Sequence, residues 1–351
     1  MPVDPLKCLE FFAGIGGFHF SLQKVCSNFE VLAAFDINTV TNSIYRANFQ
    51  DTNLLQRNIQ ALSAEYLDKF CADLWLLSPP CQPFTRRGVK KDLKDRRCDG
   101  FKSLCTQLGL MKNPPRYLIL ENVCGFEKSD AHDFFCGTLT GARFAFEEFI
   151  LSPLQIGIPN SRPRYYLLAR RDSETADFKG ELCTEFPKEL GLDRFRTCSV
   201  AEFIENNVDD CTNDLNLSTL AQTISGLDLV ASPSKQTACF TKSYSVYLKG
   251  SGSLLVTAPE LQTEAPKEQI LKLLESANEL EKQALISSFG LRFFTWREVA
   301  SLLGFPKSFT KPKEISNKQM YHAFGNSISI YVVSALLKYL LRNNSIIKST
   351  F

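Results

Sequence analysis

The sequence predicts an α/β fold, with a doubly wound sheet and a second, smaller domain. Three observations favour it: continuous apolar segments typical of buried strands, helical segments that alternate with them, and the loss of this alternation after about residue 171. The expected strands are 7–12, 31–35, 73–77, 117–120, 146–151 and 165–169. Helices are expected between them, for example at 39–49 and 63–70, and a further one at 18–26.

The weaker pattern after the last strand indicates a separate domain over residues 181–290, with short strands, polar loops and one charged helix around 267–289. Amphipathic helices at 295–303 and 328–341 follow, and the second has an apolar face suited to packing on the sheet. The chain is therefore expected to return to its first domain. The predicted parts are 1–180 and 291–345 for the α/β domain, 181–290 for the smaller domain and 346–351 for a C-terminal tail.

Composition excludes several classes of protein. With 44% hydrophobic residues among 351, the chain can bury a large core, which argues against disorder. Its 12 cysteines form no CxxC pair and accompany only three histidines, so no metal site is expected. Free thiols survive in a reducing compartment, so we expect a cytoplasmic location, with nuclear access left open. No signal peptide, transmembrane run or lipidation motif is recognised, so no membrane partner is expected.

The segment Phe11-Phe12-Ala13-Gly14-Ile15-Gly16-Gly17 lies at an expected strand-to-helix turn. Glycines there allow close approach of the backbone to a ligand, and the helix start offers free N–H groups. Asp36, at the end of the next strand, can accept hydrogen bonds from ribose hydroxyls. Because His19 stands where GxGxxG has its third glycine, a nucleoside-type ligand and a nicotinamide dinucleotide both remain open.

Cys81 is a candidate nucleophile. It lies in Pro79-Pro80-Cys81-Gln82-Pro83-Phe84, after the carboxyl end of an expected strand. A lone cysteine is usually a core residue, but the prolines here would hold the thiol in one place in a loop. Directly afterwards, residues 86–97 hold seven basic and two acidic side chains, a local basic patch in a chain of net charge +2.

Glu121, Arg162 and Arg164 are further candidates. Glu121 ends an apolar strand, where it is either an exposed cap or a carboxyl that faces the same cleft as Cys81. The two arginines are two positions apart, so in an extended chain they point the same way. They are either surface partners of anions or guanidinium groups in the pocket.

Five motifs, in this order, resemble those of the cytosine-C5 methyltransferase family. They are FAGIGG at 12–17, PPCQPF at 79–84, ENV at 121–123, SRPRYY at 161–166 and GNSIS at 325–329, and they extend over most of the chain. The segment 237–244, TACFTKSY, is similar to the CFT signature of the tRNA-aspartate methyltransferase branch. AFDIN at 34–38 and LLGFP at 302–306 are similar to that branch as well.

The resemblance implies a Rossmann-like S-adenosylmethionine-dependent methyltransferase fold, in which 181–290 is the target-recognition domain. The implied reaction transfers a methyl group to C5 of cytosine in a tRNA anticodon loop and leaves S-adenosylhomocysteine. Cys81 would add to C6, Glu121 would share a proton at N3, and Arg162 and Arg164 would hold the base carbonyl. The implied cofactor-binding residues are Phe12, Ile15, Gly16, Gly17, Asp36, Asn58, Ile59, Ser78, Asn326 and Ser327.

Contacts with nucleic acid are expected from two segments. Residues 82–100 are expected to close over the base, with Arg86, Arg87, Lys90 and Lys91 on phosphates. Cys239, Phe240 and Thr241 are expected to position the target or brace the cleft. The expected partner of this chain, acting as a monomer, is tRNA, most of all aspartate tRNA, with weak binding of DNA also considered.

Three alternatives remain. A DNA cytosine-C5 methyltransferase would use the same chemistry, although the CFT segment and the short recognition domain argue against it. A catalytically silent adaptor that binds nucleic acid is disfavoured, since Cys81, Glu121, Arg162 and Arg164 are all present. A nicotinamide-dependent oxidoreductase is disfavoured by the incomplete glycine pattern and by the PPCQ loop.

Overall fold

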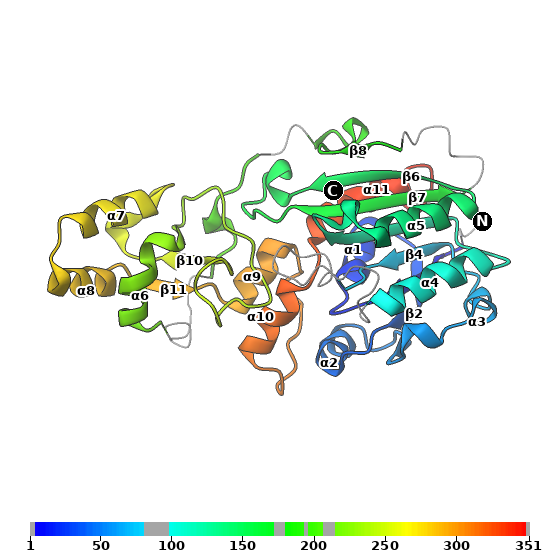
Figure 1. Cartoon of the computed structure of the whole chain (residues 1–351), viewed down its shortest axis with the longest axis horizontal. Helices are drawn as coiled ribbons and strands as arrows, with labels where there is room; N and C mark the ends of the chain where they lie inside the picture. Colours follow the sequence, from blue (N-terminus) through cyan, green and yellow to red (C-terminus); the bar gives the residue numbers. More distant parts are fainter. Residues whose placement is uncertain (1–3, 81–97, 172–179, 193–195, 206–214, 349–351) are drawn as a thin grey trace.

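The computed structural model describes residues 4–80, 98–171, 180–192, 196–205 and 215–348. Within these ranges a large body, built on one sheet, carries a smaller lobe (Figure 1). The sheet has the strand order β3-β2-β1-β4-β5-β7-β6-β8. Its strands are β1 Leu6–Phe11, β2 Phe29–Phe35, β3 Leu54–Leu55, β4 Leu74–Leu77, β5 Tyr117–Val123, β6 Phe144–Leu151, β7 Arg164–Arg171 and β8 Leu182–Cys183.

The sheet changes direction where β7 enters. Strands β3, β2, β1, β4 and β5 are parallel, whereas β7 is antiparallel to both β5 and β6. After β1 the chain builds outward through β2 to β3, then returns to place β4 on the other side of β1. This reversal leaves a crevice at the carboxyl ends of β1 and β4, which is where open α/β sheets bind ligands.

Helices cover both faces of the sheet, which explains why β4 is wholly apolar and buried and why most residues of β1 and β5 are buried. One face packs against α1 Gly17–Val25, α2 Thr39–Asn48 and α11 Ile330–Leu340. The other packs against α3 Ala64–Asp68, α4 Asp99–Leu110 and α5 Asp130–Gly141. Segment Asn317–Leu340 is long and apolar enough to span a membrane, but its most apolar window is 72% buried inside the protein, as in a core helix.

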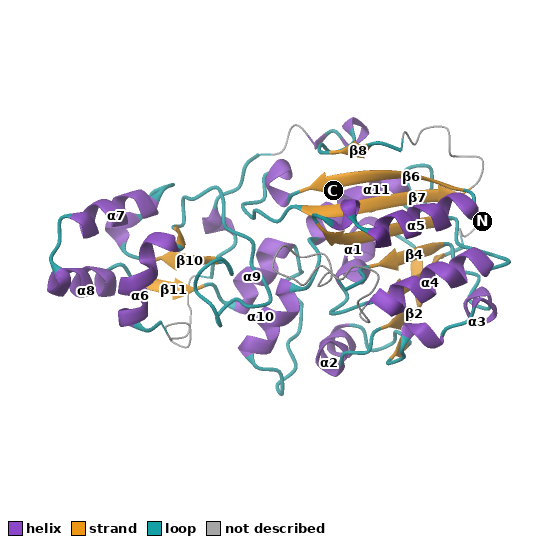
Figure 2. Ribbon diagram, viewed as in Figure 1, coloured by secondary structure: helices purple, strands orange, loops and turns teal. Residues whose placement is uncertain are grey.

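The smaller lobe has its own three-stranded sheet, in the order β11-β10-β9. Figure 2 labels β10 and β11 beside the helices of this lobe. Its strands are β9 Asp228–Val230, β10 Ser253–Val256 and β11 Leu291–Phe293, and its helices are α6 Leu217–Thr223, α7 Pro266–Glu275 and α8 Glu279–Ser288. The chain then returns to the large body through α9 Trp296–Leu303 and α10 Asn317–Gly325, before α11. The expected domain limits stay a prediction. β8, which lies within the expected smaller domain, pairs with the large sheet, and β11, which lies just beyond it, pairs with the small sheet.

The expected α/β fold is confirmed, with two local corrections. The charged helix expected around 267–289 is two helices, α7 and α8, separated at residues 276–278. The strand expected at 117–120 continues to Val123, because β7 pairs with it along its whole length. Glu121 and Asn122 therefore belong to the strand itself, opposite Tyr166 and Tyr165, rather than following it.

Candidate functional site

A cavity of about 520 Å³ opens at the carboxyl ends of β1, β4 and β5. The predicted site residues on its wall are Phe12, Asp36, Asn58, Ile59, Ser78, Glu121, Arg162, Arg164 and Asn326. They come from seven separate segments of the chain, which the fold brings together at one cavity. The cavity walls are mixed in polarity, as is common in sites for small organic ligands.

The turn after β1 is shaped by residues with positive φ. Phe12 has φ 57° and Gly14 has φ 56°, which directs the Gly14 N–H at the Asp36 carboxylate, 2.8 Å from Oδ2. The other oxygen of Asp36 accepts from the Asn38 N–H, also at 2.8 Å. Burial raises the pKa of the Asp36 carboxyl, although these backbone hydrogen bonds oppose the shift. The carboxylate is thus fixed on the cavity wall, with lone pairs left to accept from a ligand.

Gly16 and Gly17 are required for packing. A Cβ at Gly16 would lie 2.4 Å from the Phe49 ring, and one at Gly17 would lie 2.6 Å from Ile328 Cγ1. These glycines let α1 approach α2 and the segment before α11. Among the ten predicted cofactor residues, Ile15, Gly16, Gly17 and Ser327 are not on the wall of this cavity. Binding of a cofactor by the ten stays a prediction.

Several residues of the wall were not predicted from the sequence. They include Ile37, Asn38, Thr41, Arg57 and Gln60. Ile37 directly follows Asp36, and its side chain is 67% exposed although it is apolar. The sequence signal that could have identified Ile37 is an apolar residue directly after an acid at the end of a strand. Such a side chain can cover a flat ligand ring. The others offer no pattern that distinguishes them from ordinary loop residues.

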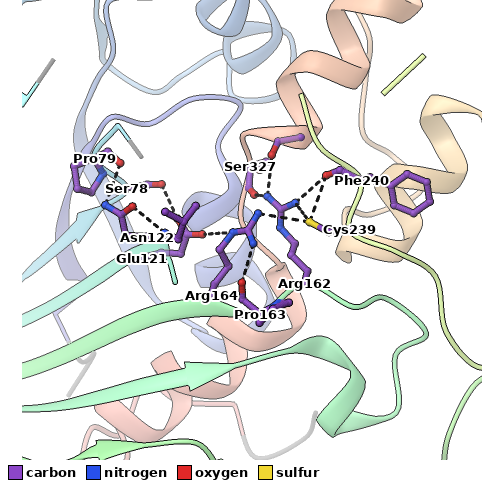
Figure 3. Close-up of polar contacts among 12 residues, drawn as sticks. Ser78, Pro79, Glu121, Asn122, Arg162, Pro163, Arg164, Cys239, Phe240 and Ser327 are labelled. Carbon is purple, nitrogen blue, oxygen red and sulfur yellow. Dashed lines mark hydrogen bonds and ion pairs between the residues drawn. The ribbon is translucent and has the colours of Figure 1, made fainter. Parts of the chain in front are cut away.

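Glu121 is the buried acid of the site. Its Oε2 accepts a hydrogen bond from the Ser78 hydroxyl at 3.0 Å, and its Oε1 lies 3.6 Å from Arg164 Nε (Figure 3). Burial raises the pKa of the Glu121 carboxyl, against the opposing effects of Arg164, Arg162 and Ser78. The carboxyl therefore holds a proton at higher pH than an ordinary glutamate does.

Arg162 joins the two lobes. It is only 2% exposed, and its guanidinium donates to the carbonyls of Phe240, at 3.0 Å, and Gly325, at 3.1 Å, and to that of Ser327 (Figure 3). Arg164, the first residue of β7 and two positions after Arg162, points the same way, since both guanidinium groups reach Cys239 (Figure 3). Its Nη1 donates to the Pro163 carbonyl at 2.8 Å, which leaves its charge facing Glu121. Arg162 therefore has the bracing contacts, and Arg164 is the freer of the two.

Cys239 of the predicted CFT segment lies against both arginines. Its Sγ is 3.5 Å from Arg162 Nη1 and 3.7 Å from Arg164 Nη2. Burial would raise the pKa of the Cys239 thiol, but the two guanidinium groups outweigh burial and lower it. Phe240 is 1% exposed and contacts Tyr244 and Phe294 edge-on, so it braces the lobe. The CFT segment thus forms a wall beside the two arginines.

Cys81, Arg86, Arg87, Lys90 and Lys91 lie outside the described residues. The described chain stops at Pro80, which is on the cavity wall together with Pro79. The side-chain amide of Asn122 donates to the Pro79 carbonyl at 3.5 Å. The segment leading to Cys81 is therefore held at the cavity by β5.

A second polar cluster lies between α5 and the sheet. His132 Nε2 is 2.6 Å from Glu148 Oε2 and 3.4 Å from Cys136 Sγ, and the Tyr165 hydroxyl donates to Glu148 at 2.6 Å. The ligand atoms of His132, Cys136 and Glu148 lie within 4.8 Å of one another. The expectation that the protein needs no metal stays a prediction.

Comparison with known proteins gives consistent matches over nearly the whole chain. The model of the family described as C-5 cytosine-specific DNA methylase matches residues 6–342. A tRNA (cytosine(38)-C(5))-methyltransferase of Spodoptera frugiperda is 40% identical over 341 residues, 95% of this chain and 98% of the relative. A DNA (cytosine-5)-methyltransferase of Dictyostelium discoideum is 32% identical over 383 residues, 97% of this chain and 96% of the relative. The crystal structure of a DNMT2 mutant of Spodoptera frugiperda superposes with a TM-score of 0.83, at 39% identity over 95% of this chain and 99% of that chain.

Proposed function

The chain belongs to the C-5 cytosine-specific DNA methylase family, and we propose that it methylates C5 of a cytosine in the anticodon loop of tRNA. The observation that carries the choice of tRNA is the 40% identity, over 98% of its length, to a relative named for tRNA cytosine-38 methylation. Aspartate tRNA is the proposed substrate, on the resemblance of the CFT segment to that branch.

The proposed cofactor is S-adenosylmethionine, and the residues of the cavity fit it. Asp36 presents a carboxylate that suits ribose hydroxyls, and Ile37 presents an exposed apolar side chain that suits the face of an adenine ring. Asn58 and Ser78 add polar groups on the same wall. When bound there, the cofactor supplies an electrophilic methyl group on a sulfonium.

Cys81 is the proposed nucleophile. Its thiolate forms a bond to C6 of cytosine, which places electron density on C5 and makes that carbon nucleophilic. Once C5 carries the methyl group, loss of the C5 proton restores the ring and breaks the bond between Cys81 and C6. Pro79 and Pro80, the two residues that precede Cys81 in the chain, lie on the cavity wall, which supports this proposal.

Glu121 and Arg164 are proposed to stabilise the ring during this addition. Attack at C6 builds negative charge that N3 must receive, and a carboxyl with a raised pKa can hold a proton there. The guanidinium of Arg164 lies beside that carboxyl and is the donor proposed for the base carbonyl. Arg162 is proposed as a positioning residue, since its hydrogen bonds go to carbonyls of the surrounding wall.

A cytosine in a stack cannot reach this cavity, so the base must turn outward. Extruding a base is least costly in a single-stranded loop, where no pairing partner is lost. The requirement favours an anticodon loop over duplex DNA. It agrees with the identity of the tRNA relative, which is higher than that of the DNA relative.

The test is methyl transfer from labelled S-adenosylmethionine to aspartate tRNA, with duplex DNA in parallel. The expected result is label on the tRNA, reduced to background in Cys81→Ala and unchanged in Cys71→Ala, since Cys71 is an exposed cysteine away from the cavity. RNA with 5-fluorocytosine at the target should trap a covalent adduct, because fluorine on C5 cannot leave as a proton. Turnover by Cys81→Ala would contradict the covalent route.

DNA is the second candidate substrate, on the 32% identity to the relative named as a DNA methyltransferase. Label on duplex DNA and none on the tRNA would keep the chemistry and replace the proposed substrate. Label on neither nucleic acid would contradict both.

A further inference from the structure

Residues 241–251 form a closed loop next to the CFT wall. The Thr241 N–H donates to the Ser251 carbonyl at 2.8 Å, which brings the two ends of the loop together. Inside it, the Tyr244 N–H donates to the Thr241 carbonyl and the Tyr247 N–H donates to the Ser243 carbonyl, both at 3.0 Å. Two consecutive turns therefore set the backbone of the loop.

Tyr244 anchors this loop to the lobe. It is 2% exposed, its hydroxyl donates to the Ser253 carbonyl at 2.7 Å, and the hydroxyl also accepts from the Phe294 N–H at 2.8 Å. Gly252 leaves room for the ring, because a Cβ there would lie 2.6 Å from it. With its base held in this way, the loop presents its tip in a fixed position.

The tip exposes apolar and basic groups together. Tyr247 is 66% exposed and Val246 is 48% exposed, and Lys249 beside them is also exposed. The backbone of Tyr247 is engaged, since its carbonyl accepts from the Ser251 hydroxyl, so the ring is directed outward from a fixed backbone. The loop sequence contains Lys242 and Lys249 and no acidic residue. A fixed aromatic ring between cations suits a nucleic-acid strand.

The loop also adjoins the catalytic cavity. Gly325 is on the cavity wall, and a Cβ there would lie 2.0 Å from the Lys242 nitrogen and 2.2 Å from the Thr241 carbonyl carbon. Cys239, two residues before the loop, contacts both arginines. Tyr247 is five positions after Lys242, so the tip is at most about 17 Å from this wall. Only nucleotides near the target base are within that reach.

We propose that the 241–251 loop is a stacking platform, in which the Tyr247 ring covers an unpaired base close to the target cytosine. Lys242 and Lys249 attract the adjoining phosphates. When the target base turns outward, its neighbours lose a stacking partner, and the Tyr247 ring replaces it. The inference rests on the proposed RNA substrate and assigns Tyr247 a positioning role.

The first test compares Tyr247→Ala with Tyr247→Phe on an anticodon stem-loop RNA. Loss of one stacked base predicts a KM for RNA at least about 5-fold higher in Tyr247→Ala, with kcat little changed. Tyr247→Phe keeps the ring and should keep the wild-type KM. Leu273→Ala removes an exposed apolar side chain on α7, 42% exposed, and is the matched control with no expected effect. Equal KM values for Tyr247→Ala and wild type would overturn the platform.

The second test measures stacking without methyl transfer. The RNA carries 2-aminopurine at one loop position at a time, and the fluorescence of this base falls when it stacks. Quenching near the target by the wild type and by Tyr247→Phe, with loss of quenching in Tyr247→Ala, is the expected result. Quenching that is absent in the wild type, or equal in Tyr247→Ala, would overturn the platform. A wild type that stacks the RNA but never methylates it would contradict the proposed function alone.

Discussion

At the scale of single residues, Glu121 shows what sequence can and cannot predict. An acid within an apolar strand is costly to bury, so its position alone marks Glu121 as a candidate. Its partners are not visible in the sequence, since Ser78 lies 43 positions away and Arg164 comes from an antiparallel neighbour. The raised pKa of Glu121 follows from burial, which only the packed structure supplies.

Replacing Glu121 with glutamine should lower kcat for methyl transfer by about 10²- to 10⁴-fold, the usual contribution of a positioned proton donor. The amide keeps the size of the side chain and a group that can accept from Ser78, so binding of S-adenosylmethionine should change little. In the wild type the rate should fall as pH rises through the raised pKa of Glu121, because the protonated form is lost. That dependence should be absent from the pH–rate profile of the residual activity of Glu121→Gln. A variant with the wild-type rate would remove Glu121 from catalysis.

At the scale of elements, the end of α10 and the CFT segment approach each other closely at the site. Gly325 ends α10, and the backbone at Thr241 and Lys242 lies where its side chain would stand. The motif GNSIS at 325–329 predicted this region as part of a site, but it did not explain why residue 325 is a glycine. The reason is the close approach of a segment more than 80 residues earlier in the chain, which no local pattern reveals.

Gly325→Ala should therefore push the 241–251 loop away from the cavity wall. The expected cost is about 1–3 kcal/mol in the free energy of unfolding, as for other overpacked sites, measured by urea denaturation. The KM for RNA should rise in the same variant. Gly137→Ala on α5 is the control, since among the described residues no atom lies within 4 Å of a Cβ added there. It should be neutral or stabilising, because alanine favours a helix. Equal stability of the two variants would contradict the assigned contact.

The contact of α5 with β6 should show in the pH dependence of stability. Hydrogen bonds with Cys136 and Glu148 raise the pKa of His132 from 6.5 to about 11. A raised pKa stabilises the folded state fully below the unfolded value of 6.5, and this gain is lost as pH rises toward 11. The drop in Tm caused by His132→Gln should therefore be largest at pH 6 and smaller at pH 9.5.

His322→Gln is the control for that measurement, because burial lowers the pKa of His322. A lowered histidine pKa destabilises the folded state at low pH instead of stabilising it. The Tm of His322→Gln should therefore not fall below that of the wild type more at pH 6 than at pH 9.5. An effect of His132→Gln that is constant across the range would mean that the cluster does not hold a charged imidazole.

At the scale of the whole molecule, the fold class could be predicted from the alternation of apolar strands and helices. The residue patterns of a strand and of a helix each depend only on neighbours along the chain, so both can be recognised in the sequence. The cavity at the ends of β1 and β4 followed too, since that edge is where parallel strands place their loops. What the sequence could not supply is the closure of one lobe on the other. Arg162 donates hydrogen bonds to the carbonyls of Phe240 and Gly325, which are 78 and 163 positions away, and no local sequence pattern reveals those pairings.

The position of α11 on the sheet has a consequence for how the protein is made. This helix completes one face of the sheet, but 158 residues of chain lie between β7, which ends at Arg171, and its first residue, Ile330. At about 5–20 residues per second, the ribosome needs roughly 8–32 s to synthesise that stretch. During this interval α1 and α2 can already pack on that face, but the part of it that α11 buries has no helix over it. We therefore expect the nascent chain to bind chaperones that recognise exposed hydrophobic surface, and slow translation of the smaller lobe to lengthen that exposure.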